Sequence, residues 1–91
     1  VVMCGTGIGA SIAANKVPGA YCALLTDCYQ AERAALSNDA NMIAMGQQVT
    51  GNKVARMMVK VWMENTGHFD PNGRSGPKVE RIYQYAEKQG S

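Results

Sequence analysis

The chain has 91 residues, 46% of them hydrophobic and ten of them glycine, which suits one compact α/β domain with a modest core and argues against disorder. The net charge of +2 is too small, and the basic residues are too scattered, to indicate nucleic-acid binding. Three cysteines without C-x-x-C spacing indicate neither disulfides nor a metal site, so a cytoplasmic location is expected, and no stretch approaches the roughly 20 apolar residues of a membrane span.

Three short apolar runs predict the strands of a parallel sheet. They cover residues 1–4, 21–25 and 42–45, and they are continuous rather than alternating, as expected of strands covered on both faces. The first helix is expected to begin within residues 7–9 and to end near Asn15, because Pro18 soon breaks the pattern.

Three further helices follow. Asp27 and Gln30 have the spacing of a capping box and predict a second helix that runs to about Ser37. Pro77 suits the first turn of a last helix, after a loop at residues 65–76. The apolar face of the third helix is predicted to be core and consists of Val54, Met57, Met58, Val61 and Trp62, and the last helix has a similar face of Val79, Ile82, Tyr83 and Ala86.

This order, β-α-β-α-β-α-α, predicts a three-layer Rossmann-like α/β fold: a doubly wound parallel sheet with helices on both faces, in a single domain over residues 1–91. Ligands of such sheets bind beyond the carboxyl ends of the strands. Most of the candidate polar residues are therefore expected at those ends or in loops that could fold over them.

The strongest local signal is Cys4, which ends the first strand and precedes the glycine-rich residues 5–9. Read through Ala10, the pattern is a G-x-G-x-x-A variant of the dinucleotide fingerprint, with Asp27 where a ribose-binding acid belongs. Alternatively, the loop N–H groups stabilise an enediolate, and Cys4 is a base whose pKa falls from about 8.5 at a helix N-terminus. A buried cysteine without a role is the third interpretation. Cys22, inside a strand, is expected to be inert.

A longer match favours the second chemistry. Residues 4–9 and the Ser-Ile-Ala-Ala-Asn-Lys-Val-Pro-Gly run at 11–19 closely resemble the type B ribose-5-phosphate isomerase family, which includes the galactose-6-phosphate isomerase subunits. The Asn-Asp-Ala-Asn run at 38–41, Gly46 and Gly51 continue the match at the family's spacing. The resemblance implies an aldose–ketose isomerase that needs no cofactor or metal and forms homodimers or homotetramers with shared active sites.

The resemblance also implies a role for each matching residue. Cys4 would be the base and Thr6 would position the reacting oxygens. Lys78 replaces an arginine of the family, so it keeps the charge but loses the planar fork. The remaining assignments are an anion hole of Gly5, Gly7, Ile8 and Gly9, substrate binding by Ser37 and Asn38, and phosphate binding by Arg74 and Lys78.

Two departures from the family bear on the substrate and on the extent of the chain. The family's aspartate-histidine pair has no counterpart here, and Val1 already lies in a strand, so we expect an absent N-terminal segment of roughly 60 residues. Ser37 stands where the family usually has a histidine that opens the sugar ring, and serine does not titrate near neutral pH.

An acyclic substrate would make that histidine dispensable, and a tetrose 4-phosphate cannot close a furanose ring because its 4-hydroxyl carries the phosphate. Residues 34–38 and 69–75 also resemble the erythrulose-4-phosphate isomerase branch of the family. The expectation is thus a tetrose-phosphate isomerase. The alternatives are a ribose-5-phosphate isomerase, a dinucleotide-binding module and a noncatalytic subunit that completes a partner's site.

Overall fold

The computed structural model describes residues 1–88, with side chains as far as Tyr85, so the predicted core position Ala86 lies outside the described side chains. The described elements follow the predicted order, and each predicted boundary is within one residue of the observed one. They are β1 (Val2–Cys4), α1 (Ile8–Asn15), β2 (Cys22–Leu24), α2 (Cys28–Leu36), β3 (Met42–Gly46), α3 (Asn52–Asn65) and α4 (Gly76–Lys88).

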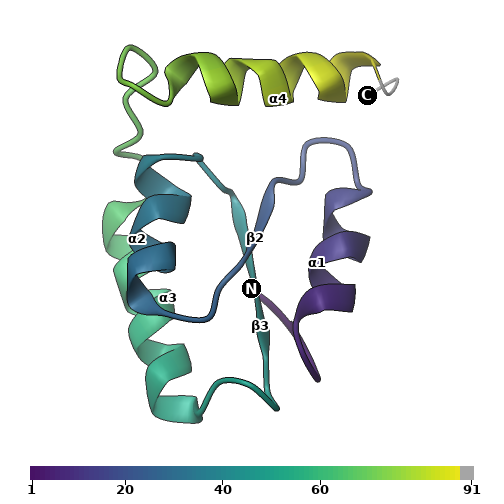
Figure 1. Ribbon diagram of the computed structural model, residues 1–91, viewed down its shortest axis with the longest axis vertical. Helices are drawn as coiled ribbons and strands as arrows, with labels where there is room; N and C mark the ends of the chain where they lie inside the picture. Colours follow the sequence, from purple (N-terminus) through teal and green to yellow (C-terminus); the bar gives the residue numbers. More distant parts are fainter. Residues whose placement is uncertain (89–91) are drawn as a thin grey trace.

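The sheet is parallel, in the order β1-β3-β2. The central strand β3 pairs with both neighbours, and its Ala44 lies opposite Val2 on one side and Leu24 on the other. Figure 1 shows α1 on one face of this sheet and α2 and α3 on the other, with α4 across one end. The predicted three-layer α/β arrangement with helices on both faces is confirmed.

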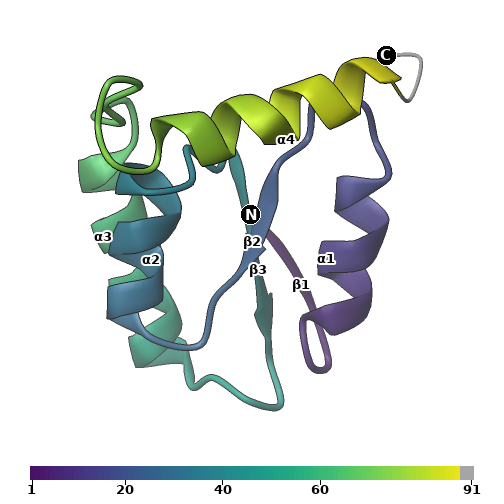
Figure 2. The ribbon, with the colours of Figure 1, turned by 45° about the horizontal axis from the view of Figure 1, so that its top comes forward.

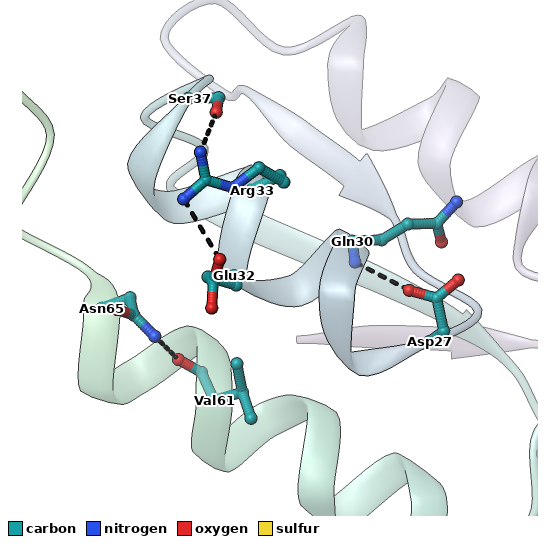
Figure 3. A network of polar contacts seen from close by, with 7 residues as sticks. All are labelled: Asp27, Gln30, Glu32, Arg33, Ser37, Val61 and Asn65. Carbon is teal, nitrogen blue, oxygen red and sulfur yellow. Dashed lines mark hydrogen bonds and ion pairs between the residues drawn. The ribbon is translucent and has the colours of Figure 1, made fainter.

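The predicted cap of α2 is confirmed in detail. The Asp27 carboxylate accepts the Gln30 N–H at 2.8 Å (Figure 3). The Gln30 side chain returns to accept the N–H of Thr26 at 2.7 Å, one residue before the position that a standard capping box uses. The turn from β2 into α2 is therefore fixed by reciprocal hydrogen bonds.

The core lies between the sheet and the pair α2 and α3. Its largest members are Leu25, Ile43, Met45 and Met58, and alanines of α2 pack beside them. These alanines let α3 approach α2 closely.

The predicted core stripe of α3 is partly wrong. Met58 is buried, and Val61 and Trp62 pack against the core as predicted. Val54 and Met57, however, are 42% and 50% exposed. Ala55 and Val59 pack against the core instead, because α3 lies against α2 as well as the sheet and turns a neighbouring face inward.

Helix α4 is held over the amino ends of the strands (Figure 2). Val79 is buried, and the Tyr83 hydroxyl donates to Asp39 Oδ2 at 2.8 Å in the loop before β3. The Tyr83 ring packs on Tyr21, just before β2, with centroids 5.2 Å apart. Ile82, predicted on the same inward face, remains 39% exposed.

Candidate active site

Cys4 ends β1 directly below the N-terminus of α1. Its Sγ accepts the Gly7 N–H at 3.2 Å. The N–H groups of Ala10 and Gly7, with smaller effects from Thr6 and Gly9, lower the pKa of the thiol below its ordinary value, although partial desolvation opposes them. These are the N–H groups that a helix leaves without backbone acceptors, so they favour the thiolate. Ala10, which contributes most, was not among the predicted site residues.

Thr6 and Ile8 form the next turn of the loop. The Ile8 N–H donates to Thr6 Oγ1 at 3.3 Å, so the hydroxyl oxygen accepts and its proton remains available to a ligand. The space around Gly9 is open, since a Cβ there would meet no atom within 4 Å. A small anion can therefore approach the loop beside the sulfur.

The shape of the loop depends on contact with the end of β3. A Cβ at Gly46 would collide with the backbone of Thr6, and Gly7 has a left-handed φ of 85°. The Gln47 N–H donates to the carbonyl oxygen of Cys4 at 2.8 Å. The glycines thus permit two backbone segments to meet where the Cys4 sulfur lies.

Gly5 is held from the same side by a residue that sequence reasoning missed. The Gln48 N–H donates to the Gly5 carbonyl at 2.9 Å, and Gln48 Oε1 lies 3.2 Å from where a Gly5 Cβ would be. Gln48 is exposed, so its amide is a further polar group at this edge. Only its place at a strand's carboxyl end could have indicated it.

The predicted substrate and phosphate residues lie at the opposite edge of the sheet. Ser37 caps the C-terminus of α2, and Asn38 follows it in the loop that leads to the amino end of β3. Arg74 precedes α4, and Lys78 is in its first turn. The expectation that most candidate polar residues lie at the carboxyl ends of the strands, or in loops that could fold over them, is not met by these four, because α2 and α3 run back along the sheet and end at its opposite edge (Figure 1).

Both predicted phosphate-binding cations are exposed. In the part of the chain that the structure describes, no carboxylate pairs with Arg74 or Lys78. Their charge is therefore not compensated by a neighbour, and an anionic ligand can reach them.

Other candidate groups have structural partners. The Asp27 carboxylate caps α2 through the Gln30 N–H, which weighs against a ribose contact in a dinucleotide site. Burial raises the pKa of the Cys22 thiol, which agrees with the prediction that it is inert.

A parallel α/β sheet whose first strand ends in a thiolate-favouring cysteine at a helix N-terminus defines a Rossmann-like protein that can hold an anion beside a base. A family model described as Ribose/Galactose Isomerase matches residues 1–82. The chain belongs to this family, and the resemblance found in the sequence is confirmed.

Relatives of two specificities match. The chain is 43% identical to D-erythrulose-4-phosphate isomerase of Pectobacterium atrosepticum over 97% of its own length, and 38% identical to ribose-5-phosphate isomerase B of Escherichia coli over 90%. The solved type B ribose 5-phosphate isomerase of Trypanosoma cruzi is 38% identical and superposes with a TM-score of 0.86 over 96% of the chain.

The chain spans little more than half the length of these relatives: 57% of the Pectobacterium and Trypanosoma proteins and 53% of the Escherichia coli one. Among the residues described here, no helix is long and apolar enough to cross a membrane.

Proposed function

We propose that the complete protein is an aldose–ketose isomerase of a small phosphosugar that works without a metal or cofactor, with Cys4 as the proton-transfer base. The observation that carries the proposal is the Cys4 sulfur itself. It accepts the Gly7 N–H at 3.2 Å, and helix N-terminal N–H groups lower its pKa. The thiolate is therefore more populated near neutral pH than that of an ordinary cysteine.

The chemistry follows from these atoms. The thiolate removes the proton from the carbon next to the substrate carbonyl, and the C–H electron pair moves to give an enediolate. N–H groups of the loop around Gly7 and Gly9 stabilise the new oxyanion, and the Thr6 hydroxyl donates toward the reacting oxygens. The hydroxyl proton then moves from the C2 oxygen to the C1 oxygen, and the thiol protonates C1 with a proton that can exchange with solvent, which converts the aldose into the ketose.

We propose that the other half of each site comes from a second copy of the chain. Asn38, Arg74 and Lys78 lie at the edge of the sheet opposite Cys4, so one copy cannot bring them to the sulfur. Ile8 and Ile12 form a stripe on α1 beside the Cys4 loop, 54% and 58% exposed, and apolar surface of this kind is commonly covered by association. A homodimer or homotetramer with shared sites satisfies both observations.

In that assembly, Arg74 and Lys78 of one copy hold the phosphate, and Asn38 contacts a substrate hydroxyl. The two cations are exposed, and Lys78 lies in the first turn of α4, where backbone N–H groups also favour an anion. A cytoplasmic location belongs to the same proposal, because a reducing compartment keeps a thiol such as that of Cys4 free.

The preferred substrate in this proposal is an acyclic tetrose 4-phosphate of the erythrulose type. Its support is Ser37, which replaces the ring-opening histidine of the family, together with the relative named D-erythrulose-4-phosphate isomerase. Ribose 5-phosphate is the alternative, supported by the relatives named for it.

The test is turnover of erythrulose 4-phosphate and ribose 5-phosphate by the complete polypeptide in D2O, followed by NMR. Wild type should incorporate solvent deuterium at the carbon that receives the proton, faster with the tetrose. Cys4→Ala should abolish turnover and keep phosphosugar binding. Unchanged turnover in Cys4→Ala would remove the mechanism, and faster turnover of the pentose would remove the substrate preference.

A further inference from the structure

We infer that Arg33 is a positioning residue that fixes the Ser37 hydroxyl as a hydrogen-bond donor to a substrate hydroxyl oxygen. The inference rests on the proposed function, since it concerns the same site. Arg33 was not among the residues singled out from the sequence, although the Arg33–Ser37 spacing of four residues places both on one side of α2.

Arg33 holds Ser37 and Asn38 through both its side chain and its backbone. Arg33 Nη1 donates to Ser37 Oγ at 3.0 Å, while Nη2 lies 3.2 Å from Glu32 Oε1. Figure 3 shows the guanidinium between these two groups. The Arg33 carbonyl accepts the N–H groups of Ser37 at 2.7 Å and Asn38 at 3.2 Å. The two expected substrate residues are therefore attached to one arginine.

The direction of the side-chain bond determines what Ser37 can do next. A guanidinium has only donors, so Ser37 Oγ must be the acceptor, and its own proton is left for a different acceptor. Within the described residues, Ser37 Oγ has no other hydrogen-bond partner. A hydroxyl held in this way presents a donor, and the matching group on a phosphosugar is an oxygen lone pair.

The setting of Arg33 supports a fixed geometry. Its Nε is buried and has no partner among the described residues, so the guanidinium is held by the contacts of its two terminal nitrogens with Ser37 and Glu32. Arg33 and Asn38 also line a hollow of about 210 Å³ along β2, together with Gln30. The arginine thus contributes to a small concave surface beside Asn38, one of the expected substrate residues.

The experiment measures kcat and KM for erythrulose 4-phosphate in the complete protein. Arg33→Met removes the donors but keeps the apolar stem, and Ser37→Ala removes the acceptor. Each should raise KM by about fivefold, the equivalent of one hydrogen bond, and leave kcat nearly unchanged, because the contact is equally present in ground and transition states. The double variant should be no worse than either single variant, and Ser37→Thr should restore most of the affinity.

Glu32→Gln is the matched control, because it removes the half-exposed ion pair and leaves the bond to Ser37; its KM should match wild type. Inhibition by inorganic phosphate should be unchanged in Arg33→Met, which would show an intact phosphate site. Should Arg33→Met not fold, Arg33→Lys replaces it; an ammonium lacks the planar guanidinium that directs Nη1 at Ser37 Oγ, so KM should again rise.

Three results would each overturn the inference: an unchanged KM in the Arg33 variant, additive effects on KM in the double variant, or an equal rise of KM in Glu32→Gln. In each case, turnover by the wild type would leave the proposed function standing. Absence of phosphosugar turnover in wild type would instead remove both.

Discussion

At the scale of single residues, the chain contains thiols in opposite environments. Helix N–H groups lower the pKa of Cys4 from the ordinary 9.0, while burial raises that of Cys22. A thiolate forms above its pKa, so we predict that iodoacetamide alkylates Cys4 with a midpoint at lower pH than that of a free cysteine, and Cys22 with a midpoint at higher pH. Mass spectrometry of peptides from the folded protein measures both. Equal midpoints would contradict the proposed activation of Cys4.

Gly46 gives a second prediction at this scale. A Cβ there would collide with the backbone of Thr6, so Gly46→Ala must push the loop after Cys4 away from the end of β3. We expect a loss of about 2 kcal/mol in the free energy of unfolding, typical of overpacking. Gly51→Ala is the control: its Cβ would meet nothing within 4 Å, and at a helix N-cap the change should cost a few tenths of a kcal/mol. Urea unfolding compares the two, and equal losses would refute the collision.

At the scale of the elements, the position of α4 on the rest of the fold depends on the hydrogen bond between Tyr83 and Asp39. Burial and the hydrogen bond to Asp39 raise the pKa of Tyr83 to about 12, so folding favours its neutral form. The stability that this raised pKa gives to the folded state is complete below the ordinary pKa of 10.0 and is lost as the pH rises toward 12. Tyr83→Phe should therefore lower stability by about 1.5 kcal/mol at neutral pH and by less at about pH 11.

Chemical unfolding at the two pH values checks this. Tyr85→Phe is the control, because Tyr85 is 53% exposed and, among the side chains that the structure describes, its hydroxyl accepts a hydrogen bond only from Arg81 Nε, at 3.4 Å. A Tyr85→Phe loss as large as that of Tyr83→Phe would show that the bond to Asp39 does not anchor α4.

The elements themselves were largely predictable from the sequence, for local reasons. Continuous apolar runs identify parallel strands. Asp27 marks the start of α2 because its carboxylate accepts the N–H of Gln30, three residues further along the chain. The loop after Cys4 was predictable for the same reason, because the cysteine and the glycines that form it are neighbours in the sequence. Periodicity alone could not show that Ala55 rather than Val54 packs against the core, because that depends on how α3 lies against the rest of the fold.

The contacts at the far edge of the sheet were harder to predict. Tyr83 and Asp39 are 44 residues apart, and nothing in their local sequence pairs them. Asp39 also has a φ of 50°, an uncommon conformation for any residue but glycine, which the Asn-Asp context alone does not require. The positions of Asn38 and Lys78 relative to Cys4 could not be predicted without knowing the direction in which each helix runs along the sheet.

At the scale of the whole molecule, the central claim is that a site combines the Cys4 edge of one copy with the Arg74 and Lys78 edge of another. The two edges are separated by the length of the strands, and α4 is fixed across the amino ends. Neither edge can cross to the other without unfolding β3, so in the proposed function the phosphate contacts of each site come from a second copy of the chain.

Mixing two inactive variants of the complete protein tests this most directly. Cys4→Ala lacks the base and the double variant Arg74→Ala, Lys78→Ala lacks the phosphate contacts. Once subunits have exchanged, half of the dimers are mixed and hold one site with no substitution, so about a quarter of wild-type phosphosugar isomerisation should return. A mixture that stays as inactive as its components, although mass spectrometry detects the mixed dimers, would contradict the shared site.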